Sequence, residues 1–239
     1  MQSNTFKRFE EKYLLTAAQY QAVLSGLRGK MQPDLFGRSI VSSIYYDTED
    51  YRLIRTSLDK PDYKEKLRVR AYGVPTPEST VFVELKKKYD GIVYKRRAAL
   101  PLSEADLLLQ GRPTQTDSQI LREIRYFLRF YKPVPSAFLS YRRVAYTGSE
   151  EGLRITFDDG IRFRTNALRL TAGTWGQELL PPSMTLMELK SPGAIPLWLC
   201  ELLNDNGIFP TSYSKYGTCY RDYIYPQLRQ AEKGKNAYA

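Results

Sequence analysis

Histidine is absent from this 239-residue sequence. Its absence excludes Ser-His-Asp and Cys-His catalysis, zinc sites with histidine ligands, and phosphohistidine intermediates. The sequence also has neither a Walker A motif nor a glycine-rich dinucleotide-binding loop. If the protein binds phosphate groups, cationic side chains must therefore hold them in place of a backbone loop.

Cysteine and long apolar runs are also scarce. Cys200 and Cys219 are the only cysteines, and they form neither a disulfide framework nor a metal-binding motif. Cys200 falls in an apolar stretch with helical spacing, which predicts a buried free thiol. No apolar run is long enough to span a bilayer, and no signal-peptide pattern is present. We therefore expect a cytoplasmic protein that would associate with a membrane only through a partner.

Cations outnumber anions. The sequence has 36 Lys and Arg against 26 Asp and Glu, a formal charge of +10 and a pI of about 9.4. Such an excess indicates an anionic partner, namely nucleic acid, a membrane surface or a phosphate compound. The cations lie within predicted strands and not in a tail, which favours a shaped site. A hydrophobic content of 42% is ordinary for a globular protein with a substantial core.

The most informative stretch is residues 64–70, which read KEKLRVR. Its four cations are spaced two apart, so in a strand all of them project from one face: Lys64, Lys66, Arg68 and Arg70. Four adjacent cations repel each other strongly unless an anion lies between them. The stretch therefore predicts a polyanion cradle, with a solvated strand face as the alternative.

Two neighbouring predicted strands repeat this pattern. Glu84 and Lys86 share a face in the strand expected over 80–89, and Lys95 and Arg97 share one in the strand over 91–100. Asp90-Gly91 between them is a hairpin turn signal. Three consecutive strands thus carry charge on one face, more densely than the outer face of a sheet usually does.

Further charged residues fall on the faces of other predicted strands. They are Arg8, Glu10 and Lys12, then Tyr141 with Arg143, Arg154 with Asp158, Arg162 with Arg164, and Glu188 with Lys190. Phosphate oxygens suit the planar fork of Arg and the point charge of Lys. Carboxylates within such a set either bridge to phosphate through a divalent cation or neutralise neighbouring cations as ion pairs. For Glu10 and Glu84 both interpretations stay open, whereas Glu188 favours the metal.

The order of elements predicts an α+β fold with an antiparallel, closed or nearly closed sheet of about eight strands and helices at its ends and edges. Residues 1–230 are expected to form one domain, and residues 231–239 a frayed tail. The remaining strands are expected over 8–15, 39–47, 63–73, 136–147, 153–164 and 184–190. Helices are expected over 17–28, 49–58, 117–131, 196–205 and 215–230, with a short one that begins at Ser103 through a capping box with Asp106.

Seven short motifs occur in a fixed order along the chain. They are Glu10-Glu11-Lys12-Tyr13, Lys66-Leu67-Arg68-Val69-Arg70, Glu84-Leu85-Lys86, Tyr94-Lys95-Arg96-Arg97, Tyr141-Arg142-Arg143, Glu188-Leu189-Lys190 and Ser214-Lys215-Tyr216. This ordered set resembles the triphosphate tunnel metalloenzymes, and within them the catalytic domain of the vacuolar transporter chaperone (VTC) complex, a polyphosphate polymerase. The resemblance spans roughly residues 6–220. Arg8 stands where the hydrolase branch carries the first of two alternating glutamates, which favours the polymerase branch.

The resemblance implies an antiparallel barrel of about eight strands around a basic tunnel, with Mn²⁺ or Mg²⁺ as cofactor. Phosphate-gripping catalytic roles carry over to Lys12, Arg68, Arg70, Lys86, Lys95, Arg143 and Lys215. Tyr141 would hydrogen-bond to substrate, and Glu188 would hold the metal, with Glu10 and Glu84 as further metal candidates. Strand phasing adds Lys66, Arg97 and Lys190 as substrate-binding residues.

Three functions are consistent with these residues. The first is transfer of the γ-phosphate of ATP onto a polyphosphate chain, and the second is hydrolysis of inorganic triphosphate or a nucleoside triphosphate. The third is non-catalytic binding of a polyanion. Carboxylates among the cations argue against nucleic acid as the ligand, because they repel phosphate. A separate membrane protein as partner stays open.

Overall fold

The computed structural model describes residues 9–90, 92–148 and 152–236. Nine strands occur in this part of the chain: β1 (Phe9–Thr16), β2 (Met31–Asp47), β3 (Tyr63–Tyr72), β4 (Thr80–Tyr89), β5 (Ile92–Pro101), β6 (Val134–Gly148), β7 (Arg154–Arg164), β8 (Gln177–Glu178) and β9 (Met184–Ser191). Its helices are α1 (Ala17–Leu27), α2 (Arg52–Leu58), α3 (Leu102–Leu109), α4 (Gln119–Tyr131), α5 (Leu197–Asp205), α6 (Lys215–Cys219) and α7 (Tyr225–Asn236). A 3₁₀ turn covers Leu170–Ala172, and a π-helical turn, Tyr220–Ile224, joins α6 to α7.

The predicted antiparallel α+β fold is confirmed. The strands are hydrogen-bonded in the order β1-β9-β7-β6-β2-β3-β4-β5, and the two-residue strand β8 pairs with β7. Within the described residues this order ends at β1 and β5, so hydrogen bonds do not close the sheet into a barrel there. Strands β1, β3, β4 and β5 lie close to their predicted bounds, whereas β2 begins eight residues before the expected residue 39.

The chain forms two compact units. Unit 1 comprises Met1–Val41, Tyr141–Arg162 and Leu180–Tyr213. Unit 2 comprises Ser42–Ser140, Phe163–Leu179 and Ser214–Ala239. That residues 1–230 form one domain, with a frayed tail after them, stays a prediction.

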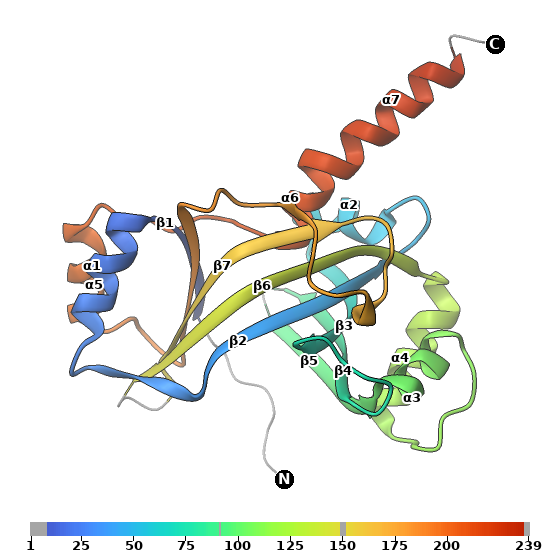
Figure 1. The fold of residues 1–239 in the computed structure, drawn as a ribbon, viewed down its shortest axis with the longest axis horizontal. Helices are drawn as coiled ribbons and strands as arrows, with labels where there is room; N and C mark the ends of the chain where they lie inside the picture. The colour runs from blue at the N-terminus through green and yellow to red at the C-terminus, as the bar shows by residue number, and fades with distance from the viewer. Residues whose placement is uncertain (1–8, 91, 149–151, 237–239) are drawn as a thin grey trace. The chain divides into compact units, whose positions relative to one another are not determined.

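In unit 1, the strands β1, β9 and β7 pack one apolar face against helices α1 and α5. The alternation of the strands sets this face, because every second residue of an antiparallel strand points to the same side. Leu15, Ile155 and Met187 are fully buried there, together with Val23 of α1 and Leu199 of α5. Figure 1 shows α1 and α5 side by side next to β1. The predicted site residues Glu10, Lys12, Glu188 and Lys190 take the opposite phase.

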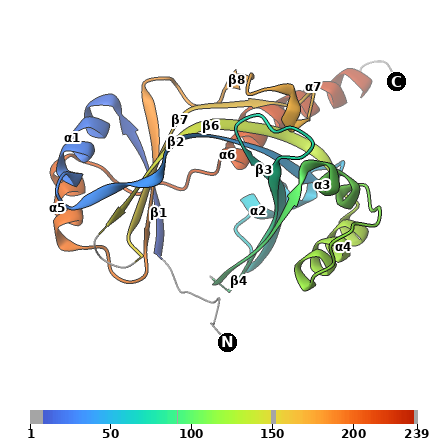
Figure 2. The ribbon, with the colours of Figure 1, turned by 60° about the horizontal axis from the view of Figure 1, so that its bottom comes forward.

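Unit 2 is built in the same way from β3, β4 and β5. Their apolar face, with Leu67, Val83 and Leu85 fully buried, packs against Leu108 of α3 and Phe127 of α4. Figure 2 shows α3 and α4 lying along these strands. The apolar spacing of residues 117–131 predicts a core-facing stripe of Ile120, Ile124, Phe127 and Leu128. The last three are buried in α4, Ile120 is partly buried, and Leu121 is buried as well.

Two local predictions are wrong. Cys200 is exposed, whereas Cys219 is buried; α5 turns Leu199 and Leu203 towards the core, and Cys200 falls between them. The helix α3 begins at Leu102 after Pro101 without a side-chain cap, so Ser103 does not cap it. Thr16 caps α1, as its place before the predicted helix suggests, and it forms a reciprocal capping box with Gln19.

Helix α7 extends to Asn236, beyond the expected end of the terminal helix at residue 230. Of the described helices, none combines the length and the apolar character that crossing a membrane requires.

Arg164, at the end of β7, organises the loop that follows it instead of joining a charged strand face. Its guanidinium donates hydrogen bonds to four main-chain carbonyls, those of Ala167, Arg169, Gly173 and Trp175, at 2.9–3.2 Å. It also lies over the Phe138 ring, 3.5 Å from the centroid. The side chain is thus a buried cation satisfied by carbonyl dipoles. The loop approaches β7 so closely that a Cβ on Gly176 would lie 2.4 Å from the carbonyl oxygen of Phe163.

We expect Arg164→Met to lower the free energy of unfolding by roughly 3 kcal/mol, because several buried carbonyls lose a charged donor at once. Urea denaturation followed by the fluorescence of the tryptophans measures this, since Trp175 lies next to the guanidinium. Arg142→Ala is the matched control: Arg142 forms an exposed pair with Asp159, and its loss costs less than about 0.5 kcal/mol. Equal effects of the two substitutions would contradict this account.

Candidate functional site

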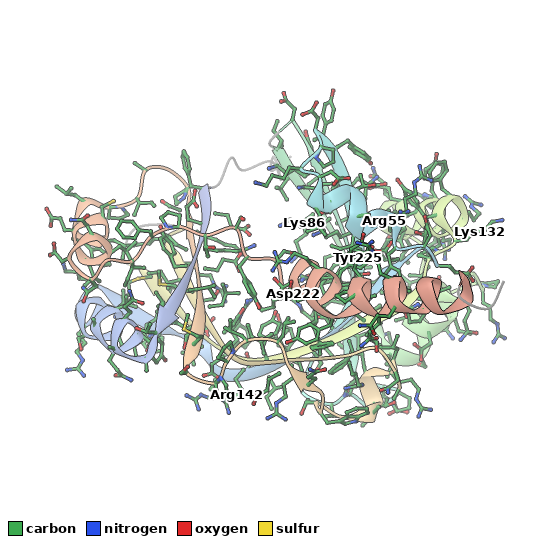
Figure 3. All side chains as sticks on the ribbon, turned by 90° about the horizontal axis from the view of Figure 1, so that it is seen from above. Arg55, Lys86, Lys132, Arg142, Asp222 and Tyr225 are labelled. Atoms are coloured by element: carbon green, nitrogen blue, oxygen red, sulfur yellow. The ribbon has the colours of Figure 1, made fainter. Side chains whose placement is uncertain are left out.

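The predicted cationic residues of β3–β5 lie on the face of these strands opposite to α3 and α4, whereas Arg96 has the other phase and pairs with Glu123 of α4. Strand register places Arg68 of β3 directly opposite Glu84 of β4, which in turn lies opposite Arg97 of β5. The next row along the same face is Lys66, Lys86 and Lys95. The predicted phasing of these strands is therefore confirmed, and one carboxylate sits within two rows of cations. Figure 3 labels Lys86 on β4.

Glu84 is the centre of this cluster. Its side chain is 2% exposed, and within the described residues four cations lie within 3.8 Å of its carboxylate. Arg68 Nε lies 2.6 Å and Arg70 Nε 3.8 Å from Oε2. Lys95 Nζ lies 2.8 Å from Oε1, which also accepts from Arg97 Nε at 2.7 Å. One carboxylate thus holds cations from β3 and β5 together across β4.

The pKa values in the cluster reflect this arrangement. Burial alone would raise the pKa of Glu84, but the charges of Arg68, Arg70 and Lys95 outweigh it and hold that pKa well below its usual range. Burial lowers the pKa of Lys95 to about 8, and the attraction of Glu84 only partly offsets this effect. Glu84 is therefore ionised at all ordinary pH values, whereas Lys95 loses its charge as the pH rises through about 8.

Tyr45 on β2 forms a further side of the cluster. Its hydroxyl accepts a hydrogen bond from Arg68 Nη1 at 3.1 Å. Its ring stacks on that of Tyr216, with centroids 4.7 Å apart and planes inclined by 20°. Tyr216 follows Lys215, the first residue of α6, in the chain. The predicted residue Lys215 is thus tied to the cluster through its neighbour.

In unit 1 the predicted site residues also share one face, whereas Arg142 and Asp159 pair with each other on the opposite side. Arg143 on β6 forms a bidentate pair with Asp158 on β7, with N–O distances of 2.6 and 2.7 Å, and Asp158 is 1% exposed. Burial would lower the pKa of Arg143, but Tyr141, Asp158 and Glu188 raise it above its ordinary value. Arg143 is therefore a permanent, rigidly held cation, and its Nη2 lies 3.9 Å from Glu188.

The strands β1 and β9 alternate charges of opposite sign. Lys12 lies opposite Glu188, and Glu10 lies opposite Lys190. The signs also alternate along each strand, and the neighbouring charges form ion pairs. Lys190 Nζ is 2.9 Å from the Glu188 carboxylate, and Lys12 Nζ is 3.9 Å from the Glu10 carboxylate. This face is nearly neutral, in contrast to the cationic face of unit 2.

The face in unit 1 suits a hard divalent cation better than the Glu84 cluster does. In the described residues, no three Asp, Glu, Cys or His side chains form a metal-binding group, but Mg²⁺ sites completed by substrate phosphates need only one or two carboxylates. Thr156 lies opposite Glu188, and its buried hydroxyl has no hydrogen-bond partner in the described part of the chain. An unsatisfied oxygen beside a carboxylate fits a metal ion or its bound water. Around Glu84 the ion-pair interpretation is favoured, because its cations would repel a metal.

The predicted residues thus fall into two groups. Unit 2 contains Lys66, Arg68, Arg70, Glu84, Lys86, Lys95, Arg97 and Lys215, and unit 1 contains Glu10, Lys12, Tyr141, Arg143, Glu188 and Lys190. Arg8 lies outside the described residues. Strand phasing missed Tyr45, which lies two residues before the buried Asp47 on β2 in a stretch without alternating burial. Tyr216 was part of a recognised motif, but nothing in the sequence linked it to Tyr45.

The VTC domain family profile matches residues 7–223. This chain belongs to the VTC domain family. The match covers the cationic strands, both groups of candidate residues and α6, and it confirms the family to which the ordered motifs pointed.

Two solved structures share the fold of this VTC domain. A candidate adenylate cyclase from Bacillus halodurans is 17% identical, with a TM-score of 0.54, and the match covers 89% of this chain and 96% of that one. A candidate adenylyl cyclase from Hippeastrum, described as having a dominant triphosphatase activity, is 16% identical, with a TM-score of 0.51. The match covers 89% of this chain and 94% of that one. A search of curated proteins finds no significant match.

We expect Glu84→Gln to destabilise unit 2 by about 3 kcal/mol near neutral pH, because the substitution leaves several cations together without their anion. The pKa of Glu84 is lowered in the folded protein, so its contribution is complete above the unfolded-state pKa and declines as the pH falls below it. The stability difference between wild type and variant should therefore shrink below about pH 4.5. Denaturant titrations over this range test it, and a difference independent of pH would contradict it.

Proposed function

We propose that this VTC domain is a phosphotransferase that moves the γ-phosphate of ATP onto a polyphosphate chain. The observation that carries this proposal is the cationic face of unit 2. Arg68, Arg70 and Arg97 with Lys95 surround one buried carboxylate, and two further lysines extend the surface. After Glu84 is neutralised, several positive charges remain on a single side of three strands. A chain of phosphates is complementary to such an array in charge.

In this proposal the residues of the chain act by position and charge. Phosphoryl transfer proceeds through a transition state whose charge is spread over phosphate oxygens, so prepositioned cations supply most of the catalysis. Glu84 holds Arg68 and Arg70 in place against their mutual repulsion, which preserves their geometry for a ligand. Lys66, Lys86 and Lys95 would reduce the repulsion between donor and acceptor phosphates. No side-chain nucleophile is required, consistent with a sequence that lacks histidine.

A divalent cation, Mn²⁺ or Mg²⁺, would be held in unit 1 by Glu188 with Glu10 nearby, and when bound it would neutralise phosphate charge. Arg143 would bind phosphate from its fixed position on Asp158, and Lys12 and Lys190 would contribute further positive charge. Tyr141 would donate a hydrogen bond to substrate. Lys215 and Arg97 complete the proposed phosphate contacts in unit 2.

Hydrolysis of a triphosphate is the second candidate, favoured by the activity in the description of the Hippeastrum protein. The two functions use the same cationic residues and differ in whether polyphosphate or water accepts the phosphoryl group.

Products distinguish these two functions. We expect the purified protein, incubated with ATP and Mn²⁺, to form polyphosphate chains that are visible on gels and sensitive to an exopolyphosphatase. Release of free phosphate with no chain growth would instead identify a triphosphatase. Absence of both products, combined with tight triphosphate binding, would identify a binding protein and refute an enzymatic role.

Substitutions test the site itself. We expect Arg70→Ala and Glu188→Ala each to lower turnover by at least about a hundredfold, because the first removes a cation that would stabilise the transition state and the second removes the carboxylate that would hold the metal. Arg122→Ala is the matched control: Arg122 lies on α4, where it pairs with Asp117, and its side chain is 64% exposed. Circular dichroism verifies that every variant folds. Full activity of either folded site variant would refute the assignment.

A further inference from the structure

Arg68 is held from two sides. Its Nε donates to Glu84 at 2.6 Å, and its Nη1 donates to the hydroxyl of Tyr45 at 3.1 Å. The Glu84 carboxylate holds the guanidinium from β4, and the Tyr45 hydroxyl holds it from β2. Since the Arg fork is planar and rigid, two contacts on different nitrogens determine where the whole group points.

Tyr45 is itself immobilised by Tyr216. The two rings stack, and the Tyr216 hydroxyl donates to Asp47 Oδ2 at 2.9 Å. Asp47 is fully buried and also accepts from the main-chain N–H groups of Leu53 and Ile54 at the start of α2, at 2.8 and 3.0 Å. The phenol that contacts Arg68 is thus connected, through a second ring and a buried carboxylate, to the main chain of α2.

The same contacts fix the start of α6. Tyr216 is 3% exposed, and it follows Lys215 directly on this short helix. The hydroxyl of Ser214 accepts from the N–H of Gly217 at 3.2 Å and closes the first turn. Anchoring Tyr216 therefore also restricts where Lys215 can lie.

We propose that Tyr45 and Tyr216 are positioning residues that hold Arg68 and Lys215 in the geometry for gripping a phosphate chain. This inference rests on the proposed function, since it assigns a role towards the same ligand. Neither tyrosine needs to touch the reacting atoms. Tyr45 sets the orientation of Arg68, and Tyr216 holds Tyr45 in place while it anchors the first turn of α6.

The proposal has a consequence for pH dependence. Burial alone would raise the pKa of Tyr45, but the charges of Arg68, Arg70 and Lys66 outweigh it and lower that pKa to about 8. Above this pH the phenolate cancels part of the cationic charge and repels an incoming phosphate. Glu84 stays ionised throughout, and burial with the charge of Asp47 keeps Tyr216 neutral. Within the Glu84 cluster the pKa of Lys95 is also about 8, so its titration must be controlled.

The experiment therefore compares Lys95→Arg, which keeps its charge at every pH, with the double variant Lys95→Arg/Tyr45→Phe. Calorimetric titration with inorganic triphosphate gives the affinity of each at about pH 7 and about pH 9. From about pH 7 to about pH 9 we expect the affinity of Lys95→Arg for triphosphate to fall about fivefold more than that of the double variant. The reason is that Lys95→Arg keeps Tyr45 and can form the phenolate, whereas the double variant cannot. Changes in the ionisation of triphosphate cancel in the comparison.

Tyr46→Phe is the matched control, because Tyr46 is the next residue on β2 and packs against the apolar core of unit 2. In the Lys95→Arg background it should leave the pH dependence unchanged. At about pH 7 we expect Tyr216→Phe to weaken triphosphate binding by about threefold, since it releases the anchor on Asp47.

The outcomes separate the two proposals. If the wild-type protein does not bind triphosphate, the proposed function fails. If it binds, but Tyr45→Phe leaves the pH dependence intact, only the positioning role of Tyr45 is overturned. A Tyr45→Phe variant that is less stable and binds more weakly by the same factor at both pH values would show a purely structural role and would likewise overturn the inference.

Discussion

The buried carboxylate of Glu84 is the interaction on which the cationic face of unit 2 depends. Arginines and lysines on neighbouring strands repel one another at the short distances that a β-sheet imposes. Glu84 lies on the middle strand, within 3.8 Å of cations from both sides, and its own burial is compensated by their charge. The cluster can therefore be dense and still belong to a stable sheet, with a net positive charge left for a ligand.

The two units share one arrangement of strands and helices but differ in the charges on their open strand faces. Each has three antiparallel strands whose apolar face packs on a pair of helices, which leaves the other face for charge. In unit 2 the charged face is cationic. In unit 1 each cation on β1 and β9 has an acidic neighbour, and a buried hydroxyl lies opposite Glu188. The first face suits phosphates by itself, whereas the second suits phosphates that arrive with a metal ion.

Much of this was accessible from the sequence. The alternation of residues in 63–73, 80–89 and 91–100 predicted three strands with charge on one face, because side-chain direction in a strand depends only on residue parity. Helix spacing predicted the buried stripe of α4 in the same way. The predictions failed where they needed contacts between distant segments. Cys200 is exposed because the core lies on another side of α5, and Arg164 binds loop carbonyls that local pattern does not reveal.

The sequence by itself determined the family, the α+β class and which residues share a strand face, since these follow from local order and periodicity. Only the tertiary structure decided which charges meet. Strand register placed Glu84 between Arg68 and Arg97. Long-range packing stacked Tyr45 on Tyr216, which is 171 residues later by their numbers, and hydrogen-bonded Tyr216 to Asp47. Electrostatic and hydrogen-bonding energies depend on distances in space, and residue parity carries no information about those distances.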